Sequence, residues 1–404
     1  MKASASARRP GALYISYDGM LEPLGQSQVI GYIERLSRDF ALHLISFEKP
    51  ADLADRDKLA PVAERLARAG IAWRPLTYHK RPTVPATLFD IAHGTLVALW
   101  LTLRHRLRLV HARSYVAALM GMAVKRLTGA RLLFDMRGLW ADERVEGGLW
   151  PTGGAVYRAA KRIERSLLRA ADRVVTLTEA SVPVLERLAA DGGREHLPIT
   201  VIPTCANLER FKPDGAARPE RFTLGYVGSI GTIYLFDEVL ACFDAIRQRR
   251  PDARLLVVNR NDQALVRAKL ADHGLAAEQV ELVAADHAEV PALVRRMSAG
   301  IGIYRPDFSR VATAPTKLAE YLGCGVPCLG NTGVGDIAFI LEHEGGGVTL
   351  HDFSAAERSR AVDRLLAMCD DPATTARCRA VALKHFSIDS GVERYRAIYR
   401  ELAG

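Results

Sequence analysis

Residues 315–336 read PTKLAEYLGCGVPCLGNTGVGD, and they say more about this chain than any other stretch of it. Pro315 suits the first turn of a helix, because the amide that proline lacks would have no partner there. The free amides of that turn and the helix dipole favour an anion, and Lys317 adds a cation at the same point. Glu320 follows three residues later, so we expect its side chain on the same face as Lys317.

A lysine for phosphate and a carboxylate for ribose hydroxyls would together hold a nucleotide diphosphate. Gly323, Gly325 and Pro327 then end the helix and lead into a short apolar strand over 326–329. The alternative is an ordinary helix–strand junction that carries a surface ion pair.

The pattern PTKLxEYLxCGxP, closing on GVGD, resembles the donor-site segment of glycosyltransferase family 4. Five shorter segments extend the resemblance over most of the chain: DGMLEPLGQSQ at 18–28, VHARSY at 110–115, DMRGLW at 135–140, IPTC at 202–205 and GYVGS at 225–229. The resemblance implies a retaining, hexosyltransferase-type enzyme of the GT-B fold that uses a nucleotide sugar.

The resemblance places the donor in the second half of the chain. We expect its contacts at a glycine turn after one strand, at an arginine after the next strand and at the helix of the 315–336 stretch: Gly228, Ser229, Arg260, Thr316, Lys317, Leu318 and Glu320. Two positions depart from the family pattern. Ala312 stands where the first of two glutamates is usual, and Ser229 stands where many members have arginine. Lys317 and Arg260, with Arg310, would then supply the cations for the leaving diphosphate.

The first half is expected to hold the acceptor. In the loop after the first strand, Gly25 would let the backbone approach a sugar and Gln26 would bond to hydroxyls. His111 and Arg113 alternate onto one side of a strand end. In the family, polar residues at such strand ends contact the sugar or the acceptor. We therefore predict Gly25, Gln26 and Arg113 on the acceptor side, and name as catalytic His111, Asp135, Arg137, Lys317 and Glu320.

Short apolar strands alternate with helices in both halves, which is typical of parallel sheets covered by helices. The fold class that we predict is α/β, with two doubly wound Rossmann-like domains facing across a cleft. We place the acceptor domain at 1–205 and the nucleotide-sugar domain at 206–385. At 386–404 we expect a last helix that packs back on the first domain, with Val392, Tyr395, Ile398 and Tyr399 roughly on one face. The length of 404 residues allows two separate cores.

Positive charge is concentrated in the first half. Residues 1–205 hold 30 basic and 20 acidic side chains, a net +10, whereas residues 206–404 hold 25 and 26, a net −1. This asymmetry indicates an acidic partner, and an anionic membrane surface fits better than nucleic acid, for which no binding motif is present. The apolar run 94–103 and the basic helix 155–172 are the two candidate contacts. In the second we expect an apolar face and an opposite arginine face, the apolar one made of Val156, Ala160, Ile163 and Leu167. A core helix and a solvated helix face are their favoured alternatives.

Six cysteines without a C-x-x-C pair, and no apolar segment before residue 14, indicate a cytoplasmic protein, with peripheral association at the inner membrane face as a hypothesis. We expect no tightly bound cofactor and no metal. The Asp-x-Asp sequence at 55–57 lies in a charged helical stretch that we interpret as surface. A UDP- or GDP-sugar would be the donor, and a glycan, a polysaccharide or a lipid-linked sugar the acceptor.

Two further functions stay open on the same motifs. One is another nucleotide-sugar enzyme, such as a UDP-sugar 2-epimerase. The other is a non-catalytic nucleotide-sugar-binding protein, which the departures at Ala312 and Ser229 would explain.

Overall fold

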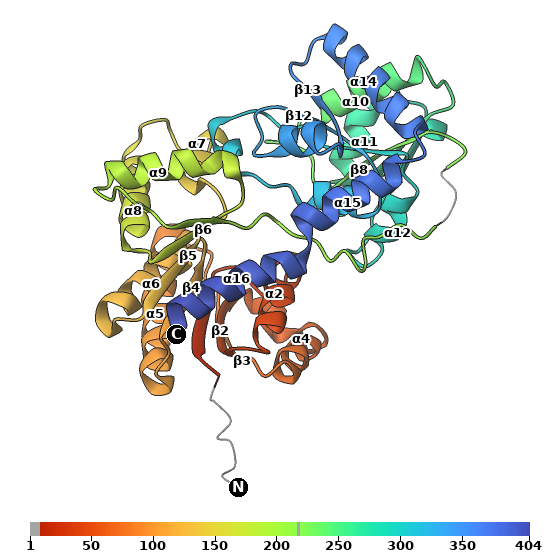
Figure 1. Cartoon of the computed structure of the whole chain (residues 1–404). Coiled ribbons are helices and arrows are strands. Elements are labelled where there is room, and N and C mark those ends of the chain that lie inside the picture. The colour runs from red at the N-terminus through yellow and green to blue at the C-terminus, as the bar shows by residue number, and fades with distance from the viewer. Residues whose placement is uncertain (1–8, 216–218) are drawn as a thin grey trace.

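The computed structural model describes residues 9–215 and 219–404. Residues 1–8 of the predicted first domain, and 216–218 of the polar stretch after the join, lie outside them. The described chain forms two parallel sheets, each covered by helices on both faces (Figure 1). The predicted pair of doubly wound domains is therefore confirmed.

The first sheet has seven parallel strands in the order β3-β2-β1-β4-β5-β6-β7. Their bounds are β1 Gly11–Ser16, β2 Ala41–Glu48, β3 Ala72–Thr77, β4 Leu109–Arg113, β5 Arg131–Asp135, β6 Arg173–Thr176 and β7 Ile199–Val201. β1 and β4 lie side by side at the centre, and β4 is buried along its whole length. A topological switch point of this kind lies at the carboxyl ends of β1 and β4, where such folds bind ligands.

Helices cover both faces of this sheet. They are α1 Pro23–Gly25, the π-helix η1 Gln26–Ile30, α2 Gly31–Leu36, α3 Pro50–Ala54, α4 Arg56–Arg68, α5 Thr83–His105, α6 Ser114–Thr128, α7 Trp140–Glu146, α8 Ala155–Ala170, the short η2 Glu179–Ser181 and α9 Val182–Asp191. Asp55 lies just before α4, and its carboxylate accepts hydrogen bonds from the amides of Asp57 and Lys58. The Asp-x-Asp sequence is thus a helix cap in this structure.

The second sheet has six parallel strands in the order β10-β9-β8-β11-β12-β13. These are β8 Thr223–Val227, β9 Arg254–Val258, β10 Val280–Val283, β11 Ala299–Ile301, β12 Cys328–Asn331 and β13 Gly347–Leu350. Its helices are α10 Phe236–Arg247, α11 Gln263–Asp272, η3 Ala277–Gln279, α12 Val290–Arg295, η4 Phe308–Ala312, α13 Thr316–Gly323, η5 Phe339–His343, α14 Ala355–Asp370 and α15 Thr374–Phe386. The strand expected over 326–329 begins two residues later, at Cys328.

The last helix, α16 Ile388–Ala403, crosses back to the first domain, as predicted (Figure 1). Val392, Tyr395, Ile398 and Tyr399 are all buried and belong to a hydrophobic core together with residues of β1, β2 and α2. The periodicity of these four residues had indicated one apolar face, and that face is the one that docks.

Two predicted helix faces differ from the structure. In α8, Ala160 and Leu167 are buried as expected, whereas Val156 and Ile163 are exposed and Glu164 is buried instead. Glu164 tolerates burial because Lys161 and the Tyr115 hydroxyl are bonded to it. The run 94–103 lies in α5, and it was expected to be a core helix. Leu96, Trp100 and Leu103 of that run are instead exposed.

Candidate functional site

The two domains meet around a small cavity of about 130 Å³. The first domain contributes the predicted acceptor residue Gln26, and the second contributes the predicted donor residues Thr316 and Glu320. The remaining wall includes Asn207, Arg210 and His287, which the sequence analysis did not single out. Side chains predicted from opposite halves of the sequence therefore line one cavity.

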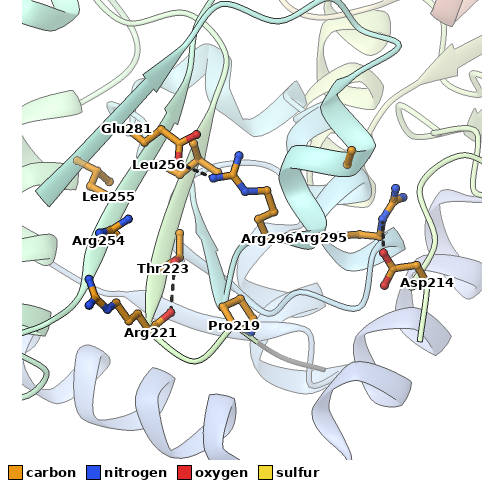
Figure 2. Close-up of a pocket in the computed structure, with 11 residues that line it drawn as sticks. Asp214, Pro219, Arg221, Thr223, Arg254, Leu255, Leu256, Glu281, Arg295 and Arg296 are labelled. Atoms are coloured by element: carbon orange, nitrogen blue, oxygen red, sulfur yellow. Dashed lines mark hydrogen bonds and ion pairs between the residues drawn. The ribbon is translucent and has the colours of Figure 1, made fainter. Parts of the chain in front are cut away.

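A larger hollow, of about 440 Å³, lies elsewhere in the second domain (Figure 2). Thr223 and Arg254 line it, and they are the first residues of β8 and β9. It therefore opens at the amino ends of the strands, opposite to the edge that carries the motif residues. Parallel sheets of this type bind ligands at the carboxyl ends, so we assign the smaller interdomain cavity to function.

Lys317 is the most unusual residue of the site. Its side chain is buried, and its Nζ atom has no hydrogen-bond partner among the described residues. The rings of Tyr226, Tyr234 and Tyr304 surround Nζ, with centroids 4.2, 4.6 and 5.6 Å away. Burial lowers the pKa of Lys317 to about 7. Three aromatic faces attract a cation, but they do not accept hydrogen bonds from the ammonium group as an anion would.

The glycine turn after β8 passes directly over this lysine. Gly228 has φ +114°, and a Cβ atom added there would lie 3.5 Å from the Lys317 Nζ. Asn259, at the end of β9, holds the turn in place by donating a hydrogen bond of 2.9 Å to the Gly228 carbonyl. Bare backbone, the ammonium group and the first turn of α13 thus converge, and these are the elements that bind a diphosphate.

Glu320 lies one turn further along α13. Its carboxylate is buried, lines the cavity and has the His287 Nδ1 4.0 Å away. No salt bridge joins it to Lys317 among the described residues, so the alternative of a surface ion pair does not hold. Burial raises the pKa of Glu320 to about 7. A carboxylate with unused acceptor capacity at a cavity wall can accept hydrogen bonds from sugar hydroxyls.

The other predicted donor residues differ in their accessibility. Leu318 is buried in the core of the second domain. Ser229 follows Gly228, and its carbonyl accepts a hydrogen bond of 2.5 Å from the Tyr226 hydroxyl. Arg260 is exposed and forms an ion pair of 2.7 Å with Asp286. Arg260 is therefore mobile enough to exchange this surface partner for a phosphate, and its donor contact stays a prediction.

Ala312, which stands where the family usually has the first of two glutamates, packs at the contact between the two domains. It is buried and belongs to the hydrophobic core of the first domain, although it comes from η4 of the second. Around it, the Ser309 amide and hydroxyl donate to the Glu146 carboxylate, and the Thr178 hydroxyl donates to the Val311 carbonyl. A glutamate at this position would have to bury its carboxylate in this interdomain contact.

Gly25 has a packing role in addition to the one predicted. A Cβ atom added there would lie 2.1 Å from the Gly19 carbonyl oxygen and 2.8 Å from the Met20 Cα atom. The glycine is therefore required for packing against the backbone of 19–20 in its own domain, and its contact with a sugar stays a prediction. Gln26 follows it in η1 and does line the cavity.

His111 and Asp135 lie under α16 in a buried network. The His111 Nδ1 is 2.9 Å from the Tyr399 hydroxyl, and the Tyr395 hydroxyl donates a bond of 3.1 Å to the Asp135 carboxylate. Both residues are 1% exposed. Neither lines the cavity among the residues that surround it, and this placement gives them a structural role, while their contact with substrate stays a prediction.

Charge in this network is balanced by two arginines. Arg113 and Arg137 each lie 3.6 Å from the Asp135 carboxylate. Burial alone would raise the pKa of Asp135, but Arg137, His111 and Arg113 together lower it. Burial lowers the pKa of His111, which is therefore neutral. Arg113 is buried, whereas Arg137 is only half-buried and reaches Thr204 at the join between the domains.

His287 could have been found by the reasoning that led to Arg260. Each follows a parallel strand of the second sheet, Arg260 after β9 and His287 after β10. The tyrosine cage carried no such signal, because its members come from β8, from the loop after β8 and from the segment after β11. Only the folded sheet brings them together.

Two doubly wound domains of parallel sheets, with a cavity at their junction, define the class: this is the GT-B fold of glycosyltransferases. Residues 36–205 match the family model described as the glycosyl transferase 4-like domain. The predicted resemblance to glycosyltransferase family 4 is confirmed.

Solved structures are similar over the whole chain. Sucrose-phosphate synthase from Thermosynechococcus elongatus has a TM-score of 0.72 at 15% identity, covering 98% of this chain and 99% of its own. Anabaena HepE, in complex with UDP and glucose, has a TM-score of 0.69 at 16% identity, covering 98% and 100%. The lipopolysaccharide outer core galactosyltransferase WaaB has a TM-score of 0.62 at 12% identity, covering 97% and 100%. At these identities the likeness shows the fold. No curated protein sequence matches the chain.

Proposed function

We propose that this protein is a retaining glycosyltransferase that moves a hexose from a nucleotide diphosphate sugar to a hydroxyl of a glycan or lipid-linked acceptor in polysaccharide biosynthesis. The single observation that carries the proposal is the buried Lys317, whose ammonium lacks an anionic partner beneath the Gly228 turn. A diphosphate would supply that partner. Because HepE was crystallised with UDP and with UDP-glucose, we propose a UDP-sugar in preference to a GDP-sugar.

The chemistry follows from the groups at the site. Lys317 and the amides at the N-terminus of α13 would stabilise the negative charge that develops on the leaving diphosphate. Glu320 would hold the ribose hydroxyls. No carboxylate pair lines the cavity in the way that a glycosidase requires. In the front-face scheme, the departing phosphate oxygen takes the acceptor proton, so the protein acts by orientation and electrostatics.

The proposal is tested by thermal stabilisation with a panel of UDP-, GDP-, ADP- and dTDP-sugars. We expect one UDP-sugar to raise Tm, and Glu320→Gln to weaken its binding about 10-fold, since hydrogen bonds to a charged group contribute about 1.5–3 kcal/mol. The matched control is Glu342→Gln, a half-buried glutamate paired with Arg364 outside the cavity. Stabilisation by no nucleotide sugar would contradict the proposal.

Two assays then separate the alternatives. Consumption of the donor without any acceptor, with release of an altered sugar, would identify an epimerase-type reaction. Donor binding without transfer or hydrolysis would identify a non-catalytic binding protein. The anomeric configuration of the product, read by NMR, tests retention.

We also expect transfer to be independent of metal. Among residues 9–215 and 219–404, no cluster of His, Cys, Asp and Glu has the geometry of a metal site, and the Asp-x-Asp sequence caps α4. Activity should therefore be unchanged in excess EDTA. Loss of activity that manganese restores would contradict this expectation.

A further inference from the structure

Helix α5 carries exposed apolar side chains that the described chain covers only in part. Val84, Leu88, Phe89, Leu96, Trp100 and Leu103 are each between 51% and 67% exposed. We call these six residues the α5 apolar face. Phe89, Leu96 and Leu103 are seven residues apart, and Trp100 follows Leu96 by four, so they share one side of the helix. From Phe89 to Leu103 this side extends about 21 Å, and Val84 and Leu88 extend the apolar surface toward an adjacent side at the N-terminal end of the helix.

The face itself carries no charge. Asp90 is the one charged side chain between residues 84 and 103, and it is completely buried, where it accepts a bond of 2.8 Å from the Tyr17 hydroxyl. An uncovered apolar surface of this length is unusual in a soluble domain and marks an interaction site.

Cations stand at both ends of the α5 apolar face. Lys80 and Arg81 precede it, and Arg104, Arg106 and Arg108 follow it; all five are exposed. None forms a salt bridge within the described part of the chain. Trp100 is flanked by Arg74, whose guanidinium carbon lies 5.7 Å from the ring centroid. An apolar stripe with a tryptophan and flanking arginines is the composition of helices that lie in a membrane interface.

We propose that the α5 apolar face docks this protein on an anionic lipid bilayer. The six apolar side chains would enter the acyl boundary while the five terminal cations meet lipid phosphates. A second copy of the chain is a poorer occupant. Faces that packed antiparallel would bring Lys80 and Arg81 of one copy against the arginines at 104–108 of the other, and no acidic side chain is present to separate them.

The helix would lie on the bilayer rather than cross it. By length and composition, Thr83–His105 is apolar enough to span a membrane, and about a third of its most apolar window is buried in the protein. Ala98 and Leu101 belong to the core of the first domain, and Asp90 is bonded to Tyr17 and His79. A crossing helix would have to break these contacts, whereas a docked one keeps them.

The orientation also suits the proposed acceptor. Because α5 follows β3, its N-terminal end lies at the carboxyl edge of the first sheet, the edge expected to hold the acceptor. Docking would therefore bring that edge close to the lipid surface. This last point rests on the proposed function; the docking itself does not.

Flotation with vesicles tests the inference on the full-length protein. We expect binding to phosphatidylcholine vesicles that contain phosphatidylglycerol, and at least about 10-fold weaker binding to phosphatidylcholine alone. Leu96→Glu should weaken binding to the anionic vesicles by at least about 10-fold. Two controls, Leu265→Glu in the second domain and Val156→Glu in α8, change residues that are 47% and 56% exposed and should leave binding unchanged.

A second measurement locates the contact. Brominated acyl chains should quench the tryptophan fluorescence of the wild type, and most of this quenching should be absent in Trp100→Phe. Stabilisation of Leu96→Glu by the donor sugar should equal that of the wild type, which shows that the variant is folded and separates this test from that of the proposed function. Wild-type binding by Leu96→Glu, or binding without anionic lipid, would overturn the inference. So would a wild-type dimer that Leu96→Glu dissociates and that does not bind vesicles.

Discussion

Replacement of Lys317 by methionine is expected to weaken donor binding, reduce transfer by about 100- to 1,000-fold and at the same time stabilise the fold. The loss of transfer follows from removing the cation beside the developing charge of the leaving group. Removal of a single group that stabilises such a charge typically costs a factor of this size. The gain in stability follows from the burial of the Lys317 side chain. Among the described residues Lys317 Nζ has no hydrogen-bond partner, so its ammonium is held at a cost that methionine in the same aromatic cage avoids.

The sign of the pH dependence can be worked out for the free protein. Burial lowers the pKa of Lys317 from 10.5 to about 7, so between these values the unfolded chain binds more protons than the folded one. Stability should therefore rise with pH from about 7 to about 10.5. Lys317→Met should remove this rise and gain about 1–2 kcal/mol at pH 7. Thermal unfolding across this pH range measures both effects.

Lys161 provides the matched control. It is also largely buried, but it is bound to the carboxylates of Asp142 and Glu164. Lys161→Met should lower Tm, because it leaves two buried carboxylates without their cation, and it should leave donor binding intact. If Lys317→Met instead lowered Tm and kept transfer within a few-fold of the wild type, Lys317 would be a structural residue and the donor site would lie elsewhere.

Donor binding should show a related pH dependence. A diphosphate beside the ammonium raises the pKa of Lys317, so binding takes up a proton wherever the free lysine is neutral. Affinity should therefore weaken as the pH rises above about 7 in the wild type. Lys317→Met should show weak binding without this slope, which isothermal calorimetry in buffers of different ionisation enthalpy can measure.

Much of this structure could be predicted from local sequence patterns. Short apolar strands that alternate with helices predict parallel sheets, and the structure has two of them. The periodicity of Val392, Tyr395, Ile398 and Tyr399 predicted the docking face of α16 because a helix must bury its apolar side. The donor motif was predictable for the same reason: helix N-terminus, lysine and glutamate are neighbours in sequence.

What sequence could not supply was contact between distant segments. Gly25 looked like a ligand contact, but the backbone of Gly19 occupies the space next to it. The apolar run 94–103 looked like core, since composition cannot tell which side of a helix a neighbour covers. The residues around His111 are spread over β1, β4, β5 and α16, so only the tertiary fold shows that this histidine is sealed from the cavity.

Asp135→Asn is expected to destabilise the protein by about 3–5 kcal/mol, the usual result of removing one member of a buried charge network. Arg113 and Arg137 would lose their common counter-ion, and the asparagine amide would point its donors at three groups that are already donors or cations. The pKa of Asp135 is lowered, so its stabilising contribution is present at neutral pH. This contribution is lost only as the pH falls below the ordinary pKa of an aspartate side chain. Urea unfolding at pH 7 measures the loss.

The same variant decides between a structural and a catalytic Asp135. If the buried network only holds α16 against β4 and β5, kcat measured well below Tm should stay within a few-fold of the wild type. Two variants calibrate the scale: Tyr395→Phe removes one hydrogen bond to Asp135 and should cost about 1 kcal/mol, and Asp39→Asn breaks the more exposed pair with Arg396 and should cost less. An unchanged Tm with a 100-fold loss of kcat would support the catalytic role predicted for Asp135 and would mean that α16 moves to admit substrate.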